Sequence, residues 1–111
     1  MSAVAEAVEV CEDWSVEPGS ARRVMVQGRA LAVFNVDGAF HVTDDTCTHG
    51  FASLAEGTLA GHVITCPWHG GAFDVRSGQP VAPPCTERLA VHACELRDGA
   101  VWARINTRKE D

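Results

Sequence analysis

Two short segments of this 111-residue chain each combine a cysteine with a histidine. The first is Cys47-Thr48-His49, and the second, after sixteen intervening residues, is Cys66-Pro67-Trp68-His69. Two thiolates and two imidazoles can hold either a structural zinc ion or an iron-sulfur cluster. We therefore expect Cys47, His49, Cys66 and His69 to bind a metal.

The spacing of these four residues bears on the choice of metal. Zinc modules commonly pair like residues, with about two to four positions between the cysteines. Here each segment is mixed, and the first has a single intervening residue. A binuclear cluster fits better, with both cysteines on one iron and both histidines on the other. A zinc-stabilised interaction module remains the alternative.

Short strand-like runs surround these segments and must position them. The predicted strands cover residues 21–27, 30–36, 39–43, 62–65, 72–75, 88–95 and 100–105. Asp37-Gly38 and Asp98-Gly99 have the composition of tight hairpin turns. Pro80, Pro83 and Pro84 predict an extended connector without regular structure, and only the Ala-rich first ten residues have helical periodicity. The pattern is typical of an all-β antiparallel sandwich or barrel.

The stretch from about residue 44 to 84 is richer in Gly, Pro, Cys and His than its flanks. We expect residues 1–111 to form one domain, in which this stretch is a small subdomain inserted into a β base domain of about 1–43 and 85–111. One hydrophobic core is feasible at this length, but a second, catalytic domain is not.

Composition excludes several classes of function. Nine basic and fifteen acidic side chains leave a net charge of -6, which disfavours nucleic acid as a partner. We expect no membrane span, because no apolar run approaches the ~20 residues that a spanning helix needs. An odd number of cysteines without an export signal disfavours a disulfide scaffold and indicates a cytoplasmic protein.

Cys47-Thr48-His49-Gly50 and Cys66-Pro67-Trp68-His69-Gly70 resemble the two cluster-binding loops of the Rieske proteins. The resemblance continues through Phe73-Asp74 and Gly78 and in the order of strands along nearly the whole chain. It implies a Rieske-like base domain and one [2Fe-2S] cluster in the inserted subdomain. Cys47 and Cys66 would bind the inner iron, and His49 and His69 the outer iron near the surface.

The chain also departs from the Rieske proteins of respiratory complexes. Those relatives carry an extra cysteine in each loop, and they place serine and tyrosine hydroxyls near the cluster sulfurs. This chain has no extra loop cysteine, has Gly71 and Ala72 after Gly70, and contains no tyrosine. Fewer hydrogen bonds to sulfur stabilise the reduced cluster less. We expect a reduction potential at the lower end of the Rieske range of about -150 to +300 mV.

Low potential and small size resemble the stand-alone Rieske ferredoxins of bacterial aromatic-ring-hydroxylating dioxygenase systems. The resemblance implies an electron carrier with no catalytic residues of its own. A carrier that exposes one port to two successive partners is expected to be monomeric. Its partners would be an NAD(P)H-dependent flavoprotein reductase and a terminal Rieske oxygenase. Phe51, Pro67 and Trp68 would shield the cluster and form the docking patch.

One further function and several single residues carry less weight. A redox-silent Rieske-fold accessory subunit is disfavoured because all four ligand residues are present. Three further cysteines have no histidine at ligand spacing, and we expect them to be buried thiols that act as small hydrophobes: Cys11, Cys85 and Cys94. The remaining histidines are expected to be solvated or hydrogen-bonded strand residues: His41, His62 and His92.

Overall fold

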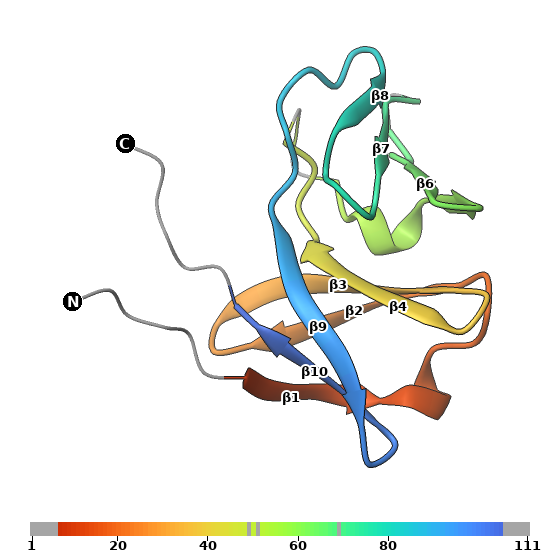
Figure 1. Cartoon of the computed structure of the whole chain (residues 1–111). Helices are drawn as coiled ribbons and strands as arrows, with labels where there is room; N and C mark the ends of the chain where they lie inside the picture. Colours follow the sequence, from red (N-terminus) through yellow and green to blue (C-terminus); the bar gives the residue numbers. More distant parts are fainter. Residues whose placement is uncertain (1–6, 49, 51, 69, 106–111) are drawn as a thin grey trace.

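The computed structural model describes residues 7–48, 50, 52–68 and 70–105, and its regular structure is almost entirely β (Figure 1). The strands are β1 (Ala7–Glu12), β2 (Ala21–Val26), β3 (Arg29–Val36), β4 (Ala39–Asp44), β5 (Thr58–Ala60), β6 (Val63–Thr65), β7 (Ala72–Asp74), β8 (Pro80–Ala82), β9 (Val91–Arg97) and β10 (Ala100–Arg104). Two 3₁₀ turns complete the elements, η1 (Asp13–Ser15) and η2 (Leu54–Glu56). No helix in the described part of the chain has the length and apolar character needed to cross a membrane.

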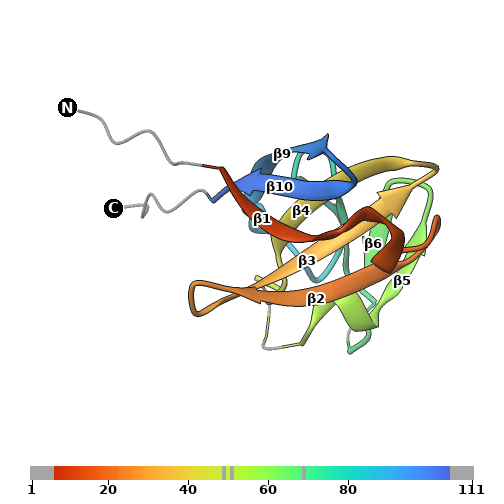
Figure 2. The same ribbon diagram turned by 90° about the horizontal axis from the view of Figure 1, so that it is seen from below.

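The larger sheet has the strand order β1-β10-β9-β4-β3-β2, and all its pairings are antiparallel. Its two edge strands, β1 and β2, contact each other, so the sheet nearly closes on itself. In Figure 2 this sheet lies in front of the smaller one, with β1 beside β10. The Asp37-Gly38 and Asp98-Gly99 turns have positive φ at both residues, as a tight hairpin requires. The all-β prediction is confirmed.

The smaller sheet has the order β5-β6-β7-β8 and is also antiparallel. It lies above the larger sheet in Figure 1. The prediction that the prolines exclude regular structure was wrong for Pro80, which begins β8 and pairs with Phe73. A sheet tolerates proline in an edge strand, because the missing N–H faces no partner there.

The sequence also misjudged the chain before the first predicted strand. Helical periodicity is present in the first ten residues, but from Ala7 onward the chain forms β1. Pairing with β10 decides this, because it buries Val10 and Cys11 in the core. A β-bulge between Glu9 and Cys11 shifts the register and hides the alternation that would have indicated a strand.

The two hydrophobic clusters found among the described residues share β3, whose residues 31–36 are all buried. Leu31 and Val33 belong to the cluster inside the larger sheet. Ala32 and Phe34 belong to the cluster between the two sheets. Because successive side chains in a strand point to opposite faces, one strand serves two cores. Cys47, Cys66 and Cys85 all lie in the second cluster: Ala32, Phe34, Val36, Cys47, Ala52, Leu54, Ile64, Cys66, Phe73, Val75, Cys85 and Leu89.

The connector from the smaller sheet back to β9 packs against the β7–β8 turn at Gly78. Gly78 has φ +81°, and a Cβ there would lie 2.0 Å from the carbonyl oxygen of Leu89. Leu89 N–H also donates to the Gly78 carbonyl oxygen at 2.8 Å. Only glycine therefore allows this contact between the turn and the connector.

We predict that Gly78→Ala lowers the free energy of unfolding more than Gly38→Ala does. Both positions have positive φ, but a Cβ at Gly38 meets nothing within 4 Å. The backbone strain is therefore matched, and the difference reports the clash with Leu89, which we expect to cost about 1–3 kcal/mol. Urea unfolding of the two variants measures it. Equal losses would contradict the close approach.

Candidate metal centre

The hydrophobic cluster between the two sheets, called the second cluster below, contains three cysteines, and each of them follows the end of a strand. Cys47 comes shortly after β4, Cys66 directly after β6, and Cys85 shortly after β8. Because β6 and β8 both pair antiparallel with β7, they run in the same direction, and Ala72 pairs with the last residue of each. Cys66 and Cys85 therefore lie beyond the same end of the strands of the smaller sheet.

The two segments that were predicted to hold the metal are closed by matching backbone hydrogen bonds. Cys47 N–H donates to the Ala52 carbonyl oxygen at 3.0 Å, and Cys66 N–H donates to the Gly71 carbonyl oxygen at 2.7 Å. The residues outside these bonds are paired antiparallel in both segments, Thr46 with Ser53 and Thr65 with Ala72. Each loop is thus a six-residue hairpin tip that begins with its cysteine.

Burial of the two loop cysteines fits them to an iron-sulfur cluster. Cys47 and Cys66 are each 2% exposed, among apolar side chains of the second cluster. A site of this kind excludes water from metal-bound sulfur, which helps to set the reduction potential. His49 and His69 lie outside the described residues, and among the described residues no group of three or more potential ligands is placed to hold a metal ion.

Cys85 is the residue at this site that sequence reasoning missed. Its Sγ lies 3.8 Å from Cys47 Sγ, and it is 4% exposed. Burial, together with the neighbouring thiols of Cys47 and Cys66, raises the pKa of Cys85 to about 11. The sequence interpretation of a buried thiol is correct, but spacing along the chain could not reveal a neighbour 38 positions away.

Close packing at Gly71 makes room for this third thiol. A Cβ at Gly71 would lie 2.4 Å from Cys85 Sγ and 3.1 Å from the Cys85 backbone nitrogen. Thr48 in the first loop donates to the Glu87 carbonyl oxygen at 2.9 Å, which ties that loop to the same connector. The two loops and the segment around Cys85 therefore form one packed unit.

The second loop also presents apolar surface beside its buried cysteine. Pro67 and Trp68 are both exposed, and Trp68 retains 65% of its accessible surface. An exposed tryptophan can contact a partner protein, and protein interfaces are enriched in aromatic side chains. Phe51, the third residue predicted for the docking patch, lies outside the described residues.

Two carboxylates anchor the chain where it leaves β4 for the first loop. Asp44 accepts hydrogen bonds from Arg29 Nε and Nη2 at 2.9 and 3.1 Å, and its Oδ1 lies 3.0 Å from His92 Nε2. Asp45 is 2% exposed, pairs with Arg23 at 3.2 Å, and accepts from a backbone N–H of η2. These contacts join β2, β3, β9 and η2 to the base of the loop.

The histidines outside the loops lie largely as predicted. His92 is 1% exposed and bonded to Asp44 in the larger sheet. His41 is half-buried in β4, whereas His62 is exposed in the turn before β6. Burial, His62 and Arg76 together lower the pKa of His41.

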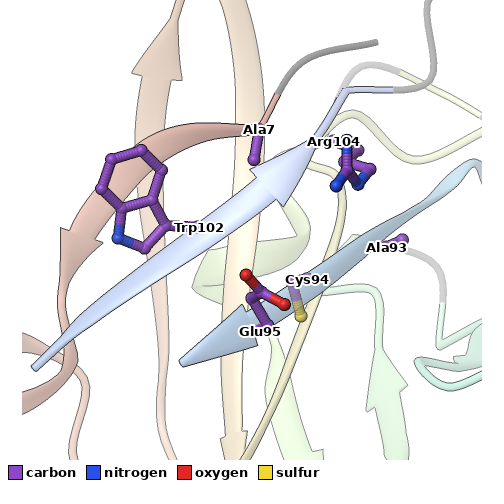
Figure 3. A pocket seen from close by; sticks show the side chains of 6 residues that line it. All are labelled: Ala7, Ala93, Cys94, Glu95, Trp102 and Arg104. Carbon is purple, nitrogen blue, oxygen red and sulfur yellow. The ribbon is translucent and has the colours of Figure 1, made fainter. Parts of the chain in front are cut away.

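Two surface depressions lie away from the cysteine loops. The pocket in Figure 3 has a volume of about 70 Å³ and is smaller than the ~300 Å³ of a typical ligand site. It is lined by Ala7, Ala93, Cys94, Glu95, Trp102 and Arg104. An open groove of about 440 Å³ runs past Trp14, Phe40 and Leu96. Neither depression is lined by Cys47 or Cys66.

Comparison with known proteins gives consistent matches. Residues 6–98 match the family described as Rieske [2Fe-2S] domain. The chain is 51% identical to ferredoxin CarAc of Metapseudomonas resinovorans over 96 residues, 86% of this chain and 90% of that protein. It is 39% identical to the ferredoxin component of the p-cumate 2,3-dioxygenase system of Pseudomonas putida over 100 residues, 88% of this chain and 85% of that protein.

A solved structure has the same fold at high identity. One chain in the complex of reduced oxygenase and oxidized ferredoxin in carbazole 1,9a-dioxygenase superposes with a TM-score of 0.86 and 47% identity. The superposition covers 94% of this chain and 97% of that chain.

We predict that Asp44→Asn lowers the free energy of unfolding at neutral pH. The free energy of unfolding of the variant should also fall less than that of wild type as the pH is lowered. Burial by itself raises the pKa of Asp44, but hydrogen bonds with His92 and Arg29 outweigh it and hold this pKa below its usual value. The stabilisation is therefore complete above the unfolded pKa of about 3.9 and is lost as pH falls through the lower folded pKa. At pH 7 the variant should lose about 1–3 kcal/mol.

Thermal unfolding of the two proteins between pH 7 and pH 3, followed by circular dichroism, measures this dependence. The gap between wild type and Asp44→Asn should stay constant down to about pH 5 and then narrow. Asp37→Asn, which removes an exposed carboxyl in the β3–β4 turn, is the control and should follow the wild-type curve. A gap that widens on acidification would contradict the prediction.

Proposed function

Because this chain belongs to the Rieske [2Fe-2S] domain family, we propose that it is the ferredoxin component of an aromatic-ring dioxygenase system. It carries one Rieske-type cluster and transfers electrons; it is not itself an enzyme. The observation that carries the proposal is the pair of matching six-residue loops, each with a buried cysteine at its start. Relatives with high identity over most of this chain are named as ferredoxins of such systems.

We propose Cys47, His49, Cys66 and His69 as the ligands, with the cysteines on the inner iron and the histidines on the outer iron. The burial of both cysteines supports this assignment. Each histidine stands within the six residues that the backbone hydrogen bond of its loop encloses. When bound, the cluster supplies a site that takes up and releases one electron at a time.

The chain's own residues prepare this site. The apolar side chains of the second cluster exclude water from the two cysteine sulfurs. The backbone hydrogen bonds from Cys47 to Ala52 and from Cys66 to Gly71 close the base of each loop. Pro67 and Trp68 form exposed apolar surface beside Cys66, and together with Phe51 we assign them to docking and to shielding the cluster.

We assign two successive partners to this surface, a flavoprotein ferredoxin reductase and a terminal Rieske oxygenase. The solved complex of a 47%-identical ferredoxin with its oxygenase supports the second. We propose that it works as a monomer, because one exposed patch that meets the two partners in turn needs no second copy of the chain. The cytoplasm is its proposed location, in line with five free cysteines.

The chain is proposed to be one Rieske domain, with residues of about 44–84 as a cluster-binding subdomain between base segments of about 1–43 and 85–111. The separate sheet of β5, β6, β7 and β8 supports this division. The aromatic substrate would bind to the oxygenase, and neither depression described above adjoins the cysteine loops.

We predict that Cys47→Ser and Cys66→Ser each abolish cluster assembly, whereas Cys94→Ser does not. Cys94 is a half-buried thiol in the larger sheet that donates to the Phe40 carbonyl oxygen at 3.2 Å. Redox titration monitored by electron paramagnetic resonance should give the low average g value of mixed Cys/His ligation in wild type and Cys94→Ser. The midpoint should fall at the lower end of the ~-150 to +300 mV range.

A wild-type spectrum from Cys47→Ser or Cys66→Ser would remove that residue from the ligand set. A midpoint well above zero would contradict the low-potential carrier. A colourless protein containing zinc and no iron would favour the interaction module instead.

We predict that Trp68→Ala weakens docking to an oxygenase without changing the cluster. Removing an aromatic anchor at the centre of an interface costs about 2 kcal/mol, or roughly 30-fold in affinity. Stopped-flow electron transfer to the oxygenase of the carbazole 1,9a-dioxygenase complex, at several oxygenase concentrations, measures the apparent dissociation constant. Trp14→Ala is the matched control, because Trp14 is 75% exposed and lies in η1, outside the cysteine loops. Equal effects of the two substitutions would exclude the proposed patch.

A further inference from the structure

A third buried thiol lies within hydrogen-bond distance of a proposed cluster ligand. Cys85 Sγ is 3.8 Å from Cys47 Sγ, and both side chains are almost completely buried. We propose that the Cys85 thiol donates a hydrogen bond to the Cys47 sulfur and thereby raises the reduction potential of the cluster. The inference rests on the proposed ligation by Cys47.

The direction of this hydrogen bond follows from the chemistry of the two sulfurs. In the protein without a metal, either thiol could be the donor. A cysteine bound to iron is a thiolate and has no proton to give. Cys85 is therefore the only possible donor of this pair when Cys47 is a ligand, and the proposed hydrogen bond runs from its S–H to the ligand sulfur.

The fold holds the Cys85 thiol in place from three sides. Cys85 N–H donates to the Ala82 carbonyl oxygen at 3.3 Å, which closes the turn at the end of β8. Gly71 leaves the space that Sγ occupies, since a Cβ there would come within 2.4 Å of it. The bond from Thr48 to the Glu87 carbonyl oxygen keeps the first loop against the connector. This position is built by packing between β8, the second loop and the first loop.

Burial increases the importance of a donor at this position. Reduction adds negative charge to the cluster and its ligand sulfurs, and in an apolar site little water is available to stabilise that charge. A hydrogen bond to sulfur stabilises the reduced state more than the oxidised state. The chain has no tyrosine, so no tyrosine hydroxyl can donate a hydrogen bond to the cluster. In this proposal Cys85, which lies outside the two loops, supplies a donor instead.

The two other buried or half-buried thiols have different surroundings. Cys11 lies in the hydrophobic cluster inside the larger sheet, and Cys94 packs against that hydrophobic cluster. Cys94 already donates to a backbone carbonyl oxygen, that of Phe40. Cys94→Ala therefore removes a partly buried thiol and its hydrogen bond without touching the cysteine loops, which makes it a matched control for Cys85→Ala.

The test is a redox titration of the cluster-loaded protein and its variants, monitored by electron paramagnetic resonance. Cys85→Ala should lower the midpoint, and Cys85→Ser, which keeps a donor, should lie above Cys85→Ala. Cys94→Ala should leave the midpoint at the wild-type value. A midpoint in Cys85→Ala at or above wild type, with the Rieske signal intact, would overturn this inference and leave the proposed function standing.

A second measurement uses the wild-type protein, so it does not depend on whether a Cys85 variant can assemble the iron-sulfur cluster. The S–H stretching bands of wild type are compared between oxidised and reduced protein by infrared difference spectroscopy. One band should shift on reduction, because the hydrogen bond to Cys47 strengthens as the sulfur gains charge, and the same band should persist in Cys94→Ala. Reduction without any change in the S–H region would show that no thiol donates to the cluster.

Discussion

Burial of β3 on both faces is the constraint on which the rest of this structure depends. Leu31 and Val33 fill the interior of the larger sheet, and Ala32 and Phe34 face the smaller sheet. Because alternate side chains of a strand point in opposite directions, a one-residue slip in its pairing would exchange the two cores. The antiparallel register of β3 with β2 and β4 therefore also determines where the cysteine loops sit.

From that platform the smaller sheet brings together residues that are distant in sequence. Central strand β7 pairs antiparallel on both sides, so the chain leaves β6 and β8 at the same edge. Cys66 follows the first of these strands and Cys85 the second, while the first loop reaches the same place from β4. The carboxylates of Asp44 and Asp45 hold the start of that first loop to the larger sheet through Arg29 and Arg23. Rigid anchoring of this kind suits an electron carrier, because little reorganisation then accompanies a change of charge.

Much of the fold was predictable from local chemistry. The Asp37-Gly38 and Asp98-Gly99 turns adopt the positive φ values that their sequences favour. Where prediction failed, pairing decided the outcome. β1 forms because its pairing with β10 buries apolar side chains, and β8 accepts Pro80 because it is an edge strand. Neither reason is visible in a window of neighbouring residues.

The sequence by itself determined the family and its cofactor, because the segments that begin at Cys47 and Cys66 resemble Rieske loops and residues 6–98 match the Rieske [2Fe-2S] domain. It also determined the all-β class through its short runs and turn residues. Only the tertiary structure decided which thiols are neighbours. Cys11, Cys85 and Cys94 all lack a histidine at ligand spacing in the sequence, yet it is the sulfur of Cys85 that lies 3.8 Å from Cys47 Sγ. The physical reason is that sheet pairing and core packing, not sequence separation, set the distances between buried side chains.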